Sequence, residues 1–277
     1  MKKILLYTGL VALTLFTVSC NRELRRIEKS NDLEKKLAYA DKMYEKKKYQ
    51  MAQTLYEEMI PVFKGTDKFE PLYYKYAYCS FYLKDYTQAA FHFKNYLDAL
   101  PSSPRAMEID YQQAYCYYKL SPKVPLDQTN TMKAIAAMQT FINTYPQSDK
   151  STEASVVIDL LRRKLEQKDY NAAELYFNLG HFKASGVAFK SLMRAYPDSE
   201  KSDSYKFMAI KAYYQYAKNS VHYRQKERYE TVVNEYLEFN DRYPSSKLRG
   251  DAEKYFTLAK NNIKTLENEQ NKTESVQ

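Results

Sequence analysis

The side chains best suited to metal binding or nucleophilic catalysis in this 277-residue chain are three histidines and three cysteines. His92, His181 and His222 lie far apart in the sequence, without the spacing to a cysteine or a carboxylate pair that metal sites show. We place His92 on the outer face of a helix and His181 in a turn, both at the surface. The chain has no glycine-rich phosphate loop and no Gly-x-Ser-x-Gly motif. We therefore expect a protein that is not an enzyme and that holds no cofactor and no metal.

Cys20 is the residue whose surroundings favour a specific covalent modification. It follows a Met-Lys-Lys start and an apolar run over residues 4–18, and the sequence becomes charged directly after it. A helix of that run would span about 22 Å, short of a bilayer core of roughly 30 Å, so a membrane-spanning anchor is not expected. The pattern is typical of a signal peptide, residues 1–19, and resembles the bacterial lipobox, in which cysteine carries diacylglycerol. Thr17 stands where lipoboxes usually have leucine, and the alternative is an ordinary cleaved signal with a chance cysteine.

The composition favours helices. The chain has 43 basic and 34 acidic side chains, a net charge of +9, 5 glycines, no tryptophan and 29 tyrosines. A protein of sheets with many turns would need more glycine and proline, so we expect an all-α fold.

A repeated ending divides the chain into similar segments. Prolines at 101, 146, 197 and 244 each follow a helical pattern, at intervals of 45 to 51 residues. Small or slim residues stand twelve positions before each proline, and large apolar residues stand eight positions before it. This pattern resembles the second helix of a tetratricopeptide repeat, which proline closes because it cannot continue a helix. The small positions are Ala89, Ala134, Ser185 and Val232, and the large ones are Phe93, Met138, Phe189 and Tyr236.

The repeats predict a right-handed superhelix of about five tetratricopeptide-like helix pairs plus a C-terminal capping helix, Leu248 to about Leu266. Their length exceeds that of the plain repeat, and we assign the excess to a loop over residues 120–129, an unbroken helix from about Lys150 to Leu179, and a polar insert over residues 218–227. Cys79 and Cys116 fall on corresponding turns of neighbouring repeats, about 10 Å apart and beyond disulfide reach, so we expect two buried thiols.

The expected organisation has five parts. A signal peptide over residues 1–19 precedes a lipidated tether over residues 20–30. N-terminal repeats with a binding groove occupy residues 31–142, and C-terminal repeats with the capping helix occupy residues 143–266. Residues 267–277 are expected to be disordered.

Aromatic residues recur along the predicted first helices at spacings of about four and then three or four. In tetratricopeptide arrays these helices line the concave face, so we expect a peptide-binding groove with Tyr74, Tyr78, Tyr111 and Tyr115 partly exposed. Rings with a polar edge give a large contact area and suit extended peptides with aromatic side chains. The alternative is that the rings fill gaps between helices. The predicted groove residues are Tyr44, Tyr74, Tyr78, Phe81, Tyr111, Tyr115 and Tyr118.

Basic runs at residues 45–49, 162–164 and 223–229 suit either an ordinary solvated helix face or a surface beside an anionic membrane. The export signal disfavours nucleic acid as a partner.

Two segments carry a resemblance to a known family: "PLDQTNTMKAIAAMQTFINTYPQS", residues 125–148, and "AELYFNLGHFKASGVAFKSLMRAYPDS", residues 173–199. With the signal, Cys20 and the five expanded repeats, they resemble the BamD family of outer-membrane assembly lipoproteins, also called ComL. The resemblance implies a scaffold of the β-barrel assembly machinery, held by its lipid at the periplasmic face of the outer membrane. It also implies that the N-terminal repeats receive C-terminal targeting segments of unfolded barrel proteins, and that the C-terminal repeats dock on periplasmic domains of the barrel-forming subunit.

Two features bear on how far this resemblance extends. Ala188 stands where the family can have a basic residue, so the family's docking residues are not transferred to this chain. Asn21 is not the aspartate that retains lipoproteins in the inner membrane of enteric bacteria, which favours the outer membrane.

Two other functions remain alternatives. Sugar-capturing nutrient lipoproteins also use tetratricopeptide helices, but they carry a large ligand-binding insertion for which the chain has no room. Coordinators of peptidoglycan or cell-envelope processes often carry an N-terminal coiled coil, for which residues 21–30 are too short.

Overall fold

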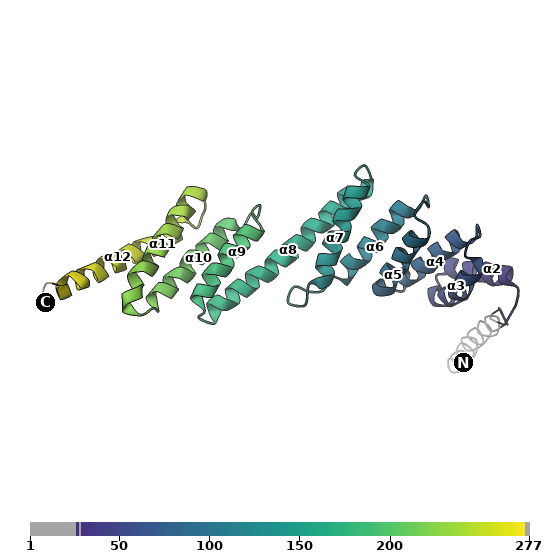
Figure 1. Ribbon diagram of the computed structural model, residues 1–277, viewed down its shortest axis with the longest axis horizontal. Coiled ribbons are helices and arrows are strands. Elements are labelled where there is room, and N and C mark those ends of the chain that lie inside the picture. Colours follow the sequence, from purple (N-terminus) through teal and green to yellow (C-terminus); the bar gives the residue numbers. More distant parts are fainter. Residues whose placement is uncertain (1–25, 28, 275–277) are drawn as a thin grey trace, which may run out of the picture. The chain divides into compact units, whose positions relative to one another are not determined.

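The computed structural model describes residues 26, 27 and 29–274, and within this part the regular structure is entirely helical, which confirms the all-α prediction (Figure 1). None of the described helices combines the length and apolar character needed to cross a bilayer. The helices are α2 (Leu33–Glu45), α3 (Tyr49–Phe63), α4 (Phe69–Tyr82), α5 (Tyr86–Ala99), α6 (Ala106–Leu120), α7 (Thr129–Thr144), α8 (Asp149–Asn178), α9 (Phe182–Ala195), α10 (Ser202–Lys218), α11 (His222–Arg242) and α12 (Arg249–Glu274).

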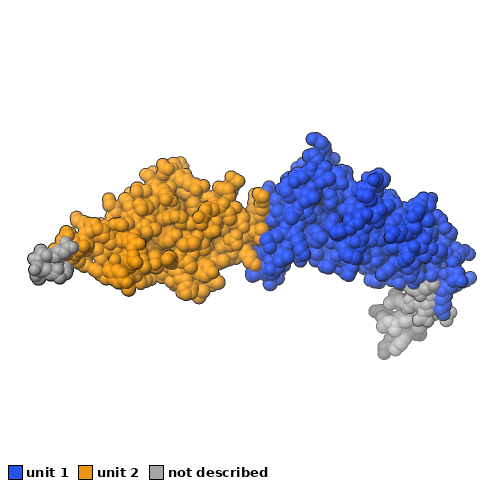
Figure 2. Space-filling view, in the orientation of Figure 1, with its two compact units in different colours: residues 1–161 blue, residues 162–277 orange. Residues whose placement is uncertain are grey.

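The chain forms two compact units, unit 1 (Met1–Leu161) and unit 2 (Arg162–Gln277), coloured separately in Figure 2. Helices α2 to α7 belong to unit 1 and α9 to α12 to unit 2, and the boundary lies within α8. Successive helices pack against each other from α2 to α7 and again from α9 to α12, as stacked helix pairs do. The division by function after residue 142 and the handedness of a superhelix stay predictions.

Local chemistry sets the helix boundaries in the first two pairs. Asp32 and Asp85 cap α2 and α5, since each carboxylate accepts a hydrogen bond from the backbone N–H three residues later, at 3.0 Å. Lys47 and Lys84 take left-handed backbone conformations in the turns before α3 and α5, with φ of 58° and 63°. Each lysine closes the tight turn that joins the two helices of its pair.

The repeated small and large positions form the core. Among the small ones, Ala89, Ala134 and Val232 are fully buried, and Ser185 is buried while its hydroxyl donates to the Ala173 carbonyl oxygen at 2.9 Å. A small side chain here lets the next helix approach closely, and a large one fills the space beside it. The large positions Phe93, Met138, Phe189 and Tyr236 are likewise buried.

A serine two residues after each proline explains how the chain starts the next helix. The Ser148 N–H donates to the Tyr145 carbonyl oxygen at 3.0 Å, and the Ser148 hydroxyl accepts from the Lys150 N–H at 3.2 Å. Ser103, Ser199 and Ser246 make the same two contacts. The recurring Pro-x-Ser motif therefore ends one helix and positions the start of the next.

The three segments assigned to the excess length lie where the sequence predicts them, and the expected disorder of the C-terminal tail is wrong for residues 267–274. The loop over residues 120–129 separates α6 from α7, and the long helix is α8. The polar insert spans the connection between α10 and α11 together with the first turns of α11, which begins at His222. The capping helix is α12, and it continues to Glu274, so residues 267–274 are helical rather than disordered. The predicted lipidation site Cys20 and most of the predicted tether lie outside the described residues.

Candidate functional site

The predicted groove residues form one continuous series of ring contacts in unit 1, which we call the aromatic row. Tyr74 contacts Tyr78 with ring centroids 4.6 Å apart, and Tyr78 contacts Phe81 at 6.1 Å. Phe81 reaches Tyr115 on α6 at 6.2 Å. Tyr115 in turn contacts Tyr111 at 6.0 Å and Tyr118 at 5.5 Å, and Tyr44 on α2 joins the row through Tyr82, which lies 6.2 Å from Tyr44 and 5.7 Å from Tyr78.

Exposure divides the row into two classes. Tyr74 and Tyr115 are half-buried, as expected for a surface that a ligand can reach. Tyr78 and Tyr111 are only 5% and 3% exposed, so the expectation that all four rings are partly exposed is wrong for these two. Their rings pack between helices, because Tyr78 also contacts Phe93 of α5 and Tyr111 contacts Phe141 of α7.

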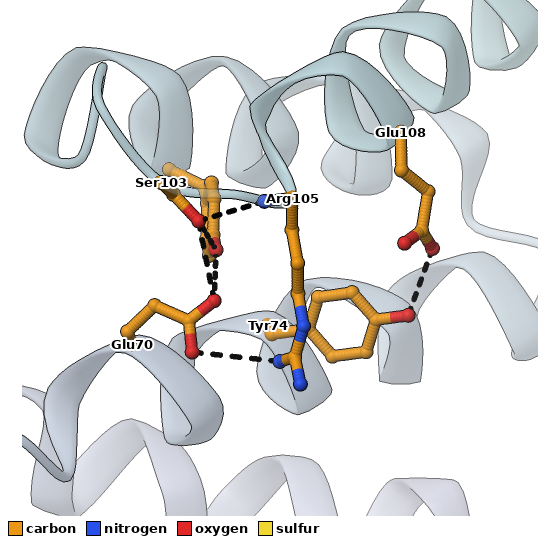
Figure 3. A network of polar contacts seen from close by, with 6 residues as sticks. Glu70, Tyr74, Ser103, Arg105 and Glu108 are labelled. Atoms are coloured by element: carbon orange, nitrogen blue, oxygen red, sulfur yellow. Dashed lines mark hydrogen bonds and ion pairs between the residues drawn. The ribbon is translucent and has the colours of Figure 1, made fainter.

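The tyrosine hydroxyls of α4 are held by a carboxylate of α6. Tyr74 donates to Glu108 Oε1 at 2.8 Å (Figure 3), and Tyr78 donates to the same oxygen. The Arg105 guanidinium lies over the Tyr74 ring, 4.3 Å from its centroid, and reaches Glu70 at 3.5 Å. The polar edges of both tyrosines are therefore fixed, while the half-buried ring of Tyr74 carries a cation at its face.

Burial and these contacts shift the acidity of both phenols. Burial, together with the hydrogen bond to Glu108, raises the pKa of Tyr74 to about 12. The same two causes raise the pKa of Tyr78. Both hydroxyls thus stay protonated near neutral pH and act as hydrogen-bond donors.

Two lysines lie over the α6 end of the row. Lys150 Nζ lies 5.0 Å from the Tyr111 ring centroid and pairs with Glu153 at 2.6 Å. Lys119 Nζ lies 5.0 Å from the Tyr115 centroid and 5.8 Å from that of Tyr118. No carboxylate of the described residues lies within ion-pair distance of Lys119, so this exposed cation is available to a ligand.

The histidines and the two internal cysteines do not form a reactive site in the part of the chain that the structure describes, where no group of three ligating side chains could hold a metal. Cys79 and Cys116 are buried and unbridged, as predicted, and burial raises the pKa of each thiol to about 12. His181 and His222 are exposed. The surface position expected for His92 is wrong, because it is 8% exposed and its ring lies 4.5 Å from that of Tyr76.

Sequence spacing missed four parts of the site. Tyr82 extends the helix face of Tyr78 by one turn and is 45% exposed, and Tyr49 of α3 stacks on it at 4.6 Å. The four-residue spacing from Tyr78 to Tyr82 was a usable signal. No spacing in the sequence indicates the roles of Glu108 and Lys119, because these roles depend on how α6 is placed against α4.

This geometry can bind aromatic or apolar side chains, with hydrogen-bond donors and cations at its edges.

Comparison with known proteins identifies relatives by sequence. The family model YfiO, described as "Outer membrane lipoprotein", matches residues 31–186. Over 136 residues the chain is 24% identical to a protein named "Outer membrane protein assembly factor BamD" from Caulobacter vibrioides. The alignment covers 49% of this chain and 45% of that relative, so the chain spans about half the length of the curated protein it matches. Among solved structures, the "TPR2AB-domain:pHSP90-complex of yeast Sti1" is similar with a TM-score of 0.40 and 12% identity, covering 82% of this chain and 98% of that one.

Proposed function

Because this chain belongs to the YfiO family of outer membrane lipoproteins, we propose that it is a non-enzymatic scaffold of the β-barrel assembly machinery. In this proposal unit 1 binds the C-terminal segments of unfolded outer-membrane proteins. The C-terminal repeats bind the periplasmic domains of the barrel-forming subunit. Thioether-linked lipid at Cys20 holds the protein at the periplasmic face of the outer membrane.

The observation that carries the proposal is the aromatic row. It contains the seven rings that the sequence spacing predicts, joined by Tyr82. Three of these rings, Tyr74, Tyr82 and Tyr115, are partly exposed and form the face that a ligand can reach. A segment that forms a strand in a barrel alternates aromatic and polar side chains, so its apolar face can lie along these rings while its polar groups face solvent. The cations beside the row add affinity for aromatic side chains and for carboxylates.

Depletion in cells tests the function directly. If the protein is an assembly scaffold, its depletion should lower outer-membrane barrel proteins while unrelated lipoproteins in the same membrane keep their levels. Unchanged barrel levels combined with altered peptidoglycan would instead support the envelope-coordination alternative.

Replacing the anchor tests the location. Cys20→Ala should abolish palmitate labelling and leave the protein soluble in the periplasm or held by an uncleaved signal, with its helix content unchanged. Palmitate labelling of the variant would exclude Cys20 as the lipidation site. Digestion of the wild-type protein by protease added to intact cells would exclude the periplasmic face.

A further inference from the structure

Unit 2 contains a cavity of about 380 Å³ lined by helices α9, α10 and α11, which we call the cationic cavity. Its chemistry differs from that of the aromatic row in unit 1, because three basic side chains line it with one carboxylate. The charged and aromatic side chains that line it are Lys183, Tyr213, Tyr216, Arg224, Glu227 and Arg228.

Arg228 is held in place without a counter-ion. Its guanidinium lies over the Tyr216 ring, 4.1 Å from the centroid, and donates to the Ser220 hydroxyl oxygen. The Ser220 hydroxyl donates in turn to the Tyr216 carbonyl oxygen, which fixes the acceptor. No carboxylate of the described residues lies within ion-pair distance of Arg228. A fixed guanidinium with free N–H donors is ready to bind an anion, because little side-chain entropy remains to be lost.

The remaining charges leave the cavity positive. Arg224 pairs with Glu227 at 2.8 Å, and both side chains are more than half exposed, so solvent weakens this pair. Lys183 is exposed and has no carboxylate within ion-pair distance among the described residues. Arg224 and Arg228 are four residues apart on α11 and therefore lie on the same helix face. Two guanidinium groups and one ammonium group thus surround the cavity against a single carboxylate.

Gly186 places the aromatic wall of the cavity. A Cβ at this position of α9 would lie 2.8 Å from Cε1 and Cζ of Tyr213, closer than carbon atoms can approach. Because glycine has no Cβ, the Tyr213 ring can lie directly against the α9 backbone. The ring then forms an apolar surface beside the cations, on which a group attached to an anion can pack.

We propose that the cationic cavity binds a phosphate-bearing ligand. Arginine pairs of this kind match the several oxygens of a phosphate through parallel N–H donors, whereas one carboxylate would leave most of these donors unused. The volume exceeds that of phosphate alone, which leaves room for an attached polar group against Tyr213. A phospholipid headgroup and a soluble phosphorylated compound share this chemistry.

Calorimetric titration of the full chain with inorganic phosphate and with glucose 6-phosphate tests the site. Arg228→Gln should weaken binding about ten- to hundredfold, the loss expected when one charge-assisted contact is removed. Arg249→Gln is the matched control, because it removes the same charge from an exposed position at the N-terminus of α12 and should leave affinity unchanged. Arg224→Gln provides a second variant. Because Arg224 is exposed, this substitution should leave the stability of the fold unchanged.

Vesicle flotation distinguishes the two sources of phosphate. If the ligand is a headgroup, vesicles containing phosphatidylglycerol should retain the wild-type chain more strongly than the Arg228→Gln chain, and phosphatidylcholine vesicles should retain both equally. Both chains carry the same N-terminal segment, so its contribution to vesicle binding cancels in the comparison. Saturable binding of glucose 6-phosphate with no such difference on vesicles indicates a soluble ligand. Absence of saturable binding in both assays, or equal losses in Arg228→Gln and Arg249→Gln, would overturn the proposal.

Discussion

The Tyr74 hydroxyl donates to Glu108 Oε1 across 2.8 Å and so links the first helices of two neighbouring repeats, α4 and α6. Tyr78 donates to the same oxygen, so one exposed carboxylate fixes two phenols of the aromatic row. The row therefore has a defined ring orientation before any ligand arrives, which reduces the entropy cost of binding.

Replacing Glu108 by glutamine should lower the pKa of Tyr74 from about 12 toward its ordinary value. The fall should be incomplete, because burial is the larger cause of the raised pKa and the variant keeps it. The measurement is NMR of ring-labelled tyrosine against pH, with a Tyr74→Phe chain to assign the signal. Glu45→Gln, at an exposed position of α2, is the control, and an equal change in both variants would contradict the direct contact.

The aromatic row should separate into binding and folding residues. Tyr74→Ala or Tyr115→Ala should weaken binding of a barrel protein's C-terminal peptide by about 1–3 kcal/mol with little change in helix content, because both rings are half-buried. Tyr78→Ala or Tyr111→Ala should instead destabilise unit 1 by about 3–5 kcal/mol, because both rings are buried.

Fluorescence anisotropy with a labelled peptide and urea unfolding measure the two effects. Tyr223→Ala is the matched control, because this tyrosine is 82% exposed and belongs to unit 2. If Tyr74→Ala and Tyr115→Ala lower stability and leave peptide affinity unchanged, the rings serve only packing.

Lys119 should recognise a carboxylate at the end of the peptide. Its ammonium group lies over Tyr115 and has no ion-pair partner among the described residues, so a terminal carboxylate can pair with it while the last side chain contacts the rings. A peptide with an amidated C-terminus should bind the wild-type chain about tenfold more weakly, as expected for the loss of one charge-assisted contact. Lys119→Gln should remove the difference between the two peptides. If wild-type affinity is the same for both, the carboxylate is not recognised, although the rings can still bind the peptide.

The sequence predicts the core of this protein better than its surface. Ala89, Phe93 and their equivalents were found because each repeat needs a small and a large side chain at the same two positions, and spacing alone reports that need. His92 was misplaced because its burial depends on Tyr76 of the preceding helix, which no periodicity within α5 reveals. The burial of Tyr78 and Tyr111 could not be predicted from spacing either, because it results from contacts with α5 and α7.

Stability at alkaline pH should depend on the two buried thiols. Burial raises the pKa of Cys79 and of Cys116 from 9.0 to about 12, so between these values the unfolded chain loses a proton that the folded chain keeps. The stabilisation that each thiol provides is therefore complete below pH 9 and is lost as the pH rises to about 12, with a slope of up to about 1.4 kcal/mol per pH unit for each thiol. Replacing both cysteines by alanine should flatten the decrease in unfolding free energy from pH 9 to 10, and the contribution of the tyrosines, which both chains share, cancels in the comparison. Identical slopes in the two chains would show that the thiols do not contribute.

A buried ion cluster should make Lys206 the most sensitive charged residue of unit 2. Lys206 is 3% exposed and pairs with Glu235, which is 4% exposed, and with the more exposed Glu238. Lys190 of α9 also pairs with Glu235, so the cluster joins α9, α10 and α11. Removal of the lysine charge leaves the buried carboxylate with one partially exposed partner, and its desolvation is no longer compensated.

Lys206→Met should therefore lower the unfolding free energy of unit 2 by about 3–5 kcal/mol, since it keeps the side-chain length and removes the charge. Glu235→Leu added to it should restore much of the loss, because a buried ion pair and an apolar pair of similar volume are often close in energy. Urea unfolding monitored through hydrogen exchange of the α10 and α11 amides measures the unfolding free energy of unit 2 separately. The double-mutant cycle decides the outcome: if the loss in the double variant equals the sum of the two single losses, the two charges are not coupled and the cluster does not hold the three helices together.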